Sequence, residues 1–260
     1  MANLINSENY SYCLHEGKFR EREVVGNQLL PFLTLENRLA YEYPERAAAI
    51  LSEKRSSIRE AIPVGARLFG DIAYNYLPFL GSINDFFPTA RFLLFIRNGK
   101  DFVRSATVLQ GEDETPVGWA PQGKSLTELE QYIALGRIQP RETDPLNEEW
   151  NRWDAFQKNT WLWTESNRLL ISALDTLEPE KCHVVRFETF MNSKLEHYQR
   201  VREFLGMDWA ISQQTQQLLE QRKINARRTY DLPEYSDWTK AQRDFFWQIA
   251  GTMMERLNYE

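Results

Sequence analysis

An apolar run that ends in a single arginine and is followed by a turn limits the possible folds more than any other segment. Residues 91–96 read RFLLFI, and a nearly continuous apolar run of this kind is typical of a strand covered on both faces. Arg97 comes next, and the Asn98-Gly99 pair predicts a turn. A helix is expected from about residue 100 to residue 109. The segment therefore predicts a buried strand, a turn and a helix in succession.

Similar patterns occur on both sides of this segment. Residues 66–71 (ARLFGD) predict a short strand, and residues 78–87 predict an amphipathic helix. Later in the chain, residues 183–187 (HVVRF) predict a further strand. Helices are expected in the second half of the chain over residues 147–177, 194–205, 210–223 and 238–257. Alternating strands and helices predict an α/β fold with a parallel sheet of the P-loop type, flanked by helices.

Residues 110–145 differ in composition from the rest. They are rich in Gly, Pro and charged residues, and they include one capped helix that begins near Ser125 and stops at Gly136. We interpret this segment as an insertion or lid within a single domain that spans residues 1–260. Trp119 lies in it and either contacts a substrate or packs into the protein.

Charge and composition exclude several classes of protein. The net charge of −6 and the pI of about 5.4 argue against a nucleic-acid-binding protein. Residues 1–10 contain no apolar signal segment, and the longest apolar run is too short to cross a membrane. We therefore expect a cytoplasmic protein without a membrane partner. The two cysteines, Cys13 and Cys182, match no metal-ligand spacing, so we expect reduced thiols and no metal.

Arg97 and Ser105 are the residues most strongly expected to bind a ligand. Arg97 follows a buried parallel strand, and ligands of open α/β sheets bind at the carboxyl ends of such strands. A guanidinium there can hold a phosphate through two parallel hydrogen bonds. Ser105 lies eight residues later, in what we expect to be the first half of the next helix, whose N-terminus also favours an anion. The alternative is an arginine in a surface turn and an incidental serine.

The same segment resembles a known one. FPTARFLLFIRNGKDFVRSA is similar to the 3′-phosphate-binding segment of sulfotransferases that use 3′-phosphoadenosine 5′-phosphosulfate (PAPS), although Gly99 stands where that family often has proline. HVVRFETFMN, with Arg186 and Glu188, resembles the family's later strand and corner. The last helix resembles the family's C-terminal helix, which often finishes in Gly-Tyr; here the pair is Asn258-Tyr259. The resemblance implies that PAPS is the cofactor and that Arg97 and Ser105 bind its 3′-phosphate.

Other site residues come from the resemblance with less support. Arg227 and Arg228 stand where the family places a basic loop that closes on the 3′-phosphate, but the glycines of that loop are absent. Sulfuryl transfer needs a base for the acceptor's proton. His15 and Glu16, which would follow a strand on the cofactor side, are the candidates, and Asp71 is an alternative.

A second signature of the family is missing. No loop of the type Pro-x-Ser-Gly-Thr-[Thr/Ser]-Trp, which holds the 5′-phosphosulfate, occurs in the sequence. Residues 1–17 resemble the family's segment immediately downstream of that loop, so we expect the true start to lie upstream or the chain to be N-terminally truncated. A sheet without that strand would expose its neighbours' edges. An immediate stop codon upstream of the Met1 codon would contradict this expectation.

The leading hypothesis is a sulfotransferase that transfers a sulfuryl group from PAPS to a hydroxyl or amine of a small molecule or sugar. An alternative is a non-catalytic remnant of the fold that acts as a binding or regulatory module. A small-molecule kinase is a third possibility, but the sequence has neither its loop lysine nor a Mg²⁺-binding motif. Neither the acceptor nor the oligomeric state can be inferred from the sequence.

Overall fold

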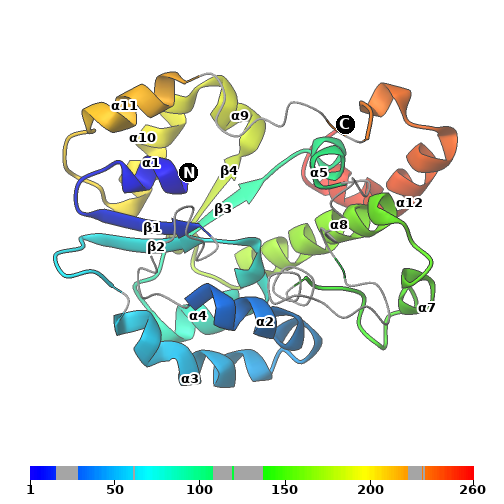
Figure 1. Cartoon of the computed structure of the whole chain (residues 1–260), viewed down its shortest axis with the longest axis horizontal. Coiled ribbons are helices and arrows are strands. Elements are labelled where there is room, and N and C mark those ends of the chain that lie inside the picture. The colour runs from blue at the N-terminus through cyan, green and yellow to red at the C-terminus, as the bar shows by residue number, and fades with distance from the viewer. Residues whose placement is uncertain (16–28, 61, 108–118, 120–136, 222–229, 231) are drawn as a thin grey trace, which may run out of the picture.

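The computed structural model describes most of the chain. The described residues are 1–15, 29–60, 62–107, 119, 137–221, 230 and 232–260. They form a mixed α/β structure in which four short strands lie between groups of helices (Figure 1). The expected capped helix after Ser125 and the candidate residues Glu16, Arg227 and Arg228 lie outside the described residues.

The strands form two parallel pairs. β1 (Ser11–His15) pairs with β2 (Leu68–Ile72), and β3 (Phe92–Ile96) pairs with β4 (Cys182–Arg186). The parallel pairing predicted from the alternating pattern is confirmed. Within the described residues each strand is paired along one edge only. All five residues of β2 are half-buried, so this strand is covered less completely than β3.

β3 is covered on both of its faces, as its apolar sequence predicted. Phe92, Leu94 and Ile96 point into a core that includes residues of helices α8 (Ala155–Leu174) and α12 (Lys240–Arg256). The alternate residues of β3 pack against a second core, which is built around helix α10 (Lys194–Leu205). Successive side chains of a strand point to opposite faces, so a strand buried on both faces needs apolar residues at every position.

Five helices of the described residues precede β3, and the first of them, α1, lies on the side of α11 while α2, α3 and α4 lie on the other side. Their bounds are α1 (Ala2–Asn6), α2 (Leu29–Glu42), α3 (Arg46–Glu60), the 3₁₀ helix η1 (Tyr74–Phe79) and α4 (Leu80–Phe86). Pro44 lies between α2 and α3, where a residue without an amide N–H ends the helix. α2, α3 and α4 lie on one side of the strands, and α10 and α11 lie on the other (Figure 1).

The long helix predicted over residues 147–177 is two helices. α7 spans Asn147–Trp150, and α8 begins only at Ala155. Asp154 starts α8 with a capping box: its carboxylate accepts the Gln157 amide at 2.8 Å, and the Gln157 side chain accepts the Asp154 amide at 3.0 Å. α7 packs in the same core as α8, so the spacing of apolar residues continues across the break between them. The periodicity of the sequence therefore did not reveal this break.

The tryptophans of this region are core residues, as predicted. Trp153, Trp161 and Trp163 are all less than a tenth exposed. Trp119, from the predicted lid, also packs: its indole N–H donates to the carbonyl of Ile138 at 2.9 Å, and its ring lies edge-on to Trp150 at 5.0 Å. Of the two roles considered for Trp119, the structure supports packing.

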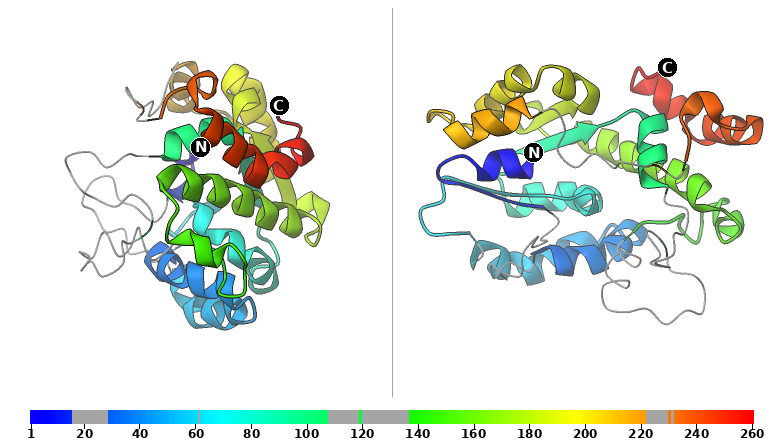
Figure 2. Two further views of the ribbon diagram at one scale, coloured as in Figure 1. Left: turned by 90° about the vertical axis from the view of Figure 1, so that its right-hand side faces the viewer. Right: turned by 45° about the horizontal axis from the view of Figure 1, so that its top comes forward.

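The remaining elements lead to the C-terminus. They are α5 (Gly99–Ala106), the 3₁₀ helix η2 (Pro179–Lys181), α9 (Phe187–Asn192), α11 (Gln213–Glu220) and the 3₁₀ helix η3 (Tyr235–Asp237). Figure 1 and the right-hand view of Figure 2 place α12 and the C-terminus beside α5. In the described part of the chain, no helix combines the length and the apolar character that crossing a membrane requires.

Candidate functional site

The candidate site is built around the turn between β3 and α5. Asn98 caps α5, because its side-chain oxygen accepts the amide N–H of Lys100 at 2.9 Å. The carbonyl oxygen of Arg97 accepts the indole N–H of Trp163 at 2.9 Å, which fixes the turn to α8. These side-chain hydrogen bonds hold the turn, which lies at the carboxyl end of β3, where open α/β sheets bind ligands.

The Arg97 side chain has the properties of an anion-binding group. Its guanidinium carbon lies 4.9 Å from the ring centre of Phe187, and its Nε is buried without a hydrogen-bond partner in the described part of the chain. A buried donor without a partner costs free energy unless a ligand or water supplies an acceptor. A half-buried guanidinium with one unused donor is therefore suited to receive an anionic group.

Phe187 is a site residue that the sequence did not single out. It follows β4 directly, and because Ile96 pairs with Arg186 in the parallel register, Phe187 comes next to Arg97. The residue is 38 % exposed, which is unusual for phenylalanine at the edge of a core. The sequence did contain one indication of this role, which is the position of the residue. Arg97 and Phe187 are each the first residue after one of two neighbouring strands.

Ser105 lies further from the start of α5 than expected. α5 ends at Ala106, so Ser105 is in its last turn and not in its first half. At about 1.5 Å per residue, the helix separates Gly99 and Ser105 by about 9 Å along its axis. Ser105 is half-buried and lies at the other end of this short helix from the Arg97 turn. The helix is shorter than predicted because Thr107, its C-cap, is extended.

The predicted basic loop is bounded by described residues that contact α5. The guanidinium of Arg104 lies 4.4 Å from the ring centre of Tyr230, and its Nε donates to the carbonyl of Leu232 at 3.3 Å. Arg104 also pairs with Glu234 at 3.2 Å. Tyr230, Leu232 and Glu234 therefore lie beside α5, whereas Arg227 and Arg228 lie outside the described residues.

The catalytic candidates belong to the other strand pair. His15 is the last residue of β1 and is paired in register with Ile72, so its backbone lies at the carboxyl end of that pair. Asp71, the alternative base, is on the adjoining strand and accepts a hydrogen bond from the hydroxyl of Tyr76. Among the described residues there is no group of three or more His, Cys, Asp or Glu side chains that could hold a metal.

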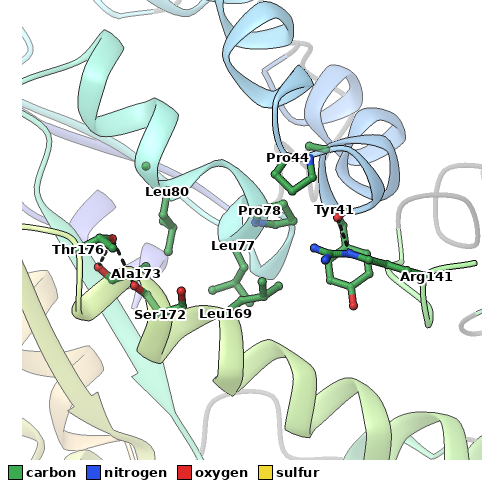
Figure 3. Close-up of a pocket in the computed structure, with 12 residues that line it drawn as sticks. Tyr41, Pro44, Leu77, Pro78, Leu80, Arg141, Leu169, Ser172, Ala173 and Thr176 are labelled. Atoms are coloured by element: carbon green, nitrogen blue, oxygen red, sulfur yellow. Dashed lines mark hydrogen bonds between the residues drawn. The ribbon is translucent and has the colours of Figure 1, made fainter. Parts of the chain in front are cut away.

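A pocket of about 180 Å³ lies elsewhere in the molecule (Figure 3). Its lining includes Leu77, Leu169 and Tyr41, and Arg141 closes one side, with its Nε donating to the Tyr41 carbonyl at 3.1 Å. The middle of α8 contacts the Arg97 turn through Trp163. The C-terminal part of α8 is followed by η2 and then by the first residue of β4. The pocket borders this later part of α8, toward the amino ends of the strands, so it is not part of the site around Arg97.

Comparison with known proteins identifies the family. A family model described as the sulfotransferase family matches residues 15–210, which are 196 of the 260 residues and include Arg97, Ser105 and Phe187. No curated protein matches the chain. The solved sulfotransferase domain from the curacin biosynthetic pathway is similar at 13 % identity, over 87 % of this chain and 77 % of that one, with a TM-score of 0.44. Because the family model covers three quarters of its length, this chain belongs to the sulfotransferase family.

Proposed function

We propose that this chain is a PAPS-dependent sulfotransferase in which Arg97 binds the 3′-phosphate of the cofactor. The observation that carries the proposal is the Arg97 guanidinium, which has an unused buried donor and lies against the exposed ring of Phe187. A phosphate supplies acceptor oxygens for a guanidinium, and an exposed aromatic ring offers a flat surface on which a purine can stack. One ligand with both groups is a 3′-phosphorylated adenine nucleotide.

The reaction would transfer a sulfuryl group in line. A hydroxyl or amine of a small molecule or sugar attacks the sulfur of PAPS, and the bond between sulfur and the 5′-phosphate oxygen breaks. The products are the sulfated acceptor and 3′-phosphoadenosine 5′-phosphate (PAP), and a base takes the proton of the acceptor. We propose His15 or Glu16 as this base, since His15 ends β1 and Glu16 comes directly after it. We assign no residue to the 5′-phosphosulfate, because the sequence of the chain contains no loop of the family's type.

A binding experiment tests the first part of the proposal. Titration calorimetry with PAP should give saturable binding, and 5′-AMP, which lacks the 3′-phosphate, should bind more weakly. Arg97→Ala should lower the affinity for PAP by about 100-fold, because it removes two charge-assisted hydrogen bonds. Arg97→Lys should recover part of the affinity, since it restores the charge without the planar fork.

Arg91→Ala is the matched control for Arg97→Ala. Arg91 directly precedes β3, is exposed, and lies at the opposite end of the strand from Arg97, where it donates to the carbonyl of Phe204. Its removal should leave the affinity for PAP unchanged. Absence of PAP binding by the wild-type chain, or an equal loss in both variants, would overturn the proposal.

Turnover distinguishes an enzyme from a binding module. The chain is mixed with radiolabelled PAPS and a panel of phenols, amines and sugars, and the release of PAP is measured. Sulfated product would support the enzyme. Binding of PAP without any turnover would favour the non-catalytic alternative.

A further inference from the structure

The last residues of the chain return to the turn between β3 and α5, the elements that flank Arg97 (Figure 1). α12 ends at Arg256, and Asn258 adopts a left-handed conformation with φ of 54°. Asparagine tolerates this conformation far better than most residues with a Cβ. The amide of Tyr259 then donates back to the carbonyl of Met254 at 2.8 Å. This reversal directs Tyr259 toward the corner after β4, and it lies outside the stretch matched by the family model.

One carboxylate joins Tyr259 to the turn. The hydroxyl of Tyr259 donates to Oε2 of Glu188 at 2.9 Å, and Oε1 of the same carboxylate accepts the amide N–H of Asn98 at 2.8 Å. Burial, and then the neighbouring Glu188, raise the pKa of Tyr259 far above its ordinary value, so the hydroxyl keeps the proton that it donates. Arg186 also contacts the tail, because its guanidinium donates to the carbonyl of Leu257 at 2.5 Å.

The contact acts on one particular peptide group. The carbonyl of Arg97 and the amide N–H of Asn98 belong to the same planar peptide. Trp163 holds the oxygen of that peptide at 2.9 Å, and Glu188 holds its nitrogen at 2.8 Å. Holding both ends of the peptide fixes the ψ angle of Arg97, and this angle sets the direction in which its side chain leaves the backbone.

A second contact fixes the tail on the other side of the turn. The ammonium of Lys100 donates to the backbone oxygen of Glu260 at 2.5 Å. It also lies 4.2 Å from the ring centre of Tyr235 and 5.1 Å from that of Trp247, within the range of a cation–π contact. The tail is therefore attached both to the peptide after Arg97 and to the first turn of α5.

We propose that Tyr259 and Glu188 are positioning residues that orient Arg97 for a 3′-phosphorylated nucleotide. The proposal rests on the proposed function, because it assigns Arg97 to the 3′-phosphate. It adds that the affinity of this site depends on the C-terminal tail through one shared carboxylate, and that the left-handed turn at Asn258 is what lets the tail reach it.

Tyr259→Phe is the direct test, because it removes the hydroxyl and keeps the ring. The affinity for PAP, measured by titration calorimetry, should fall about tenfold, as expected for one hydrogen bond to a charged group. The affinity for 5′-AMP should not change, because 5′-AMP has no 3′-phosphate for Arg97 to bind. In an Arg97→Ala background, Tyr259→Phe should have no further effect on PAP binding.

Two further positions separate positioning from general destabilisation. Tyr198→Phe removes a hydrogen bond from a fully buried tyrosine to the carbonyl of Leu4, far from the turn, so it should lower stability and leave PAP affinity unchanged. Asn258→Gly keeps the left-handed turn, so it should retain PAP affinity within about twofold. Asn258→Val disfavours that turn and should reproduce the loss seen in Tyr259→Phe.

The outcomes distinguish the two proposals. If the wild-type chain does not bind PAP, the proposed function fails. If it binds PAP and Tyr259→Phe binds equally well, the function stands and the positioning role is overturned. An equal loss of affinity for PAP and 5′-AMP would also overturn it, because the effect would then not pass through Arg97.

Discussion

Gly99 lies where three buried side chains come closest to the backbone of the Arg97 turn. A Cβ added there would lie 3.0 Å from Sδ of Met254, 3.1 Å from Phe246 and 3.1 Å from Trp163. All three side chains are at most 2 % exposed, so none of them can move aside into solvent. Close packing of α8 and α12 thus accounts for glycine at this position, where the family that the segment resembles often has proline.

We predict that Gly99→Ala lowers the free energy of unfolding by about 1–3 kcal/mol, the usual cost of an added group in a filled core. Urea denaturation measures this change. Gly81→Ala is the matched control, because Gly81 is also near the start of a helix and nothing lies within 4 Å of a Cβ built there. Gly81→Ala should be neutral or stabilise the protein by up to about 1 kcal/mol. If Gly99→Ala leaves the free energy of unfolding unchanged, the neighbouring side chains can rearrange to accommodate the methyl group, and the prediction is wrong.

At the scale of the elements, a buried ion pair links α10 to the segment that follows α1. The guanidinium of Arg202 contacts the carboxylate of Glu8, and their side chains are 7 % and 0 % exposed. Arg202 also donates to the carbonyls of Met207 and Trp209, and Glu8 accepts the amide of Ser212 at 3.3 Å. The network joins α1, α10 and the chain before α11 through charged groups that water cannot reach.

We predict that Arg202→Met lowers the free energy of unfolding by about 3–5 kcal/mol, because it leaves the Glu8 carboxylate buried without its cation. Arg200→Met, on the same helix, removes an exposed pair with Glu196, in which the side chains are 55 % and 59 % exposed. That variant should cost no more than about 0.5 kcal/mol. Equal losses in the two variants, measured by urea denaturation, would show that the buried pair contributes no more than an exposed one.

Elements with a strong local signal were predicted well. The strands β3 and β4 and helix α10 fall within one or two residues of their predicted bounds, since their apolar patterns and caps are local properties of the sequence. The break between α7 and α8 was missed because both helices pack in the same core and keep one apolar spacing across it. α9 was missed because its six residues are too few to show a period.

Across the whole molecule, three buried acidic groups should make the fold sensitive to alkali. Burial raises the pKa of the Cys13 thiol from 9.0 to about 12, with a further contribution from Asp71. Burial, followed by the charge of a nearby glutamate, raises the pKa of Tyr41 and Tyr198 well above the ordinary value of 10.0. All three side chains are at most 4 % exposed.

We predict that stability is unaffected by these groups below about pH 8, one unit below the ordinary pKa of a thiol, and falls as the pH rises beyond it. The unfolded chain loses these protons first, because the folded-state pKa values are raised, so alkali favours unfolding. Each group contributes a slope of up to about 1.4 kcal/mol per pH unit. Tyr41→Phe should reduce the slope of the unfolding free energy above pH 10, measured by urea denaturation at several pH values. An unchanged slope would contradict the prediction.

Local patterns in the sequence were enough to predict the α/β class and the parallel pairing of the strands, and they singled out Arg97 as a candidate ligand-binding residue. An apolar strand, a turn and a capped helix are each specified by neighbouring residues, so they can be read without knowing the fold. The resemblance of the same segments to sulfotransferases agrees with the family match.

The surroundings of Arg97, by contrast, became known from the tertiary structure alone. Phe187 reaches it through the register of two strands that are 90 residues apart in sequence, and Tyr259 reaches the turn through Glu188 across 71 residues. Contacts of such long range depend on how strands pair and how helices pack, and no local pattern specifies them. The arginine was therefore predictable from the sequence, whereas the aromatic ring and the carboxylate that orient it were not.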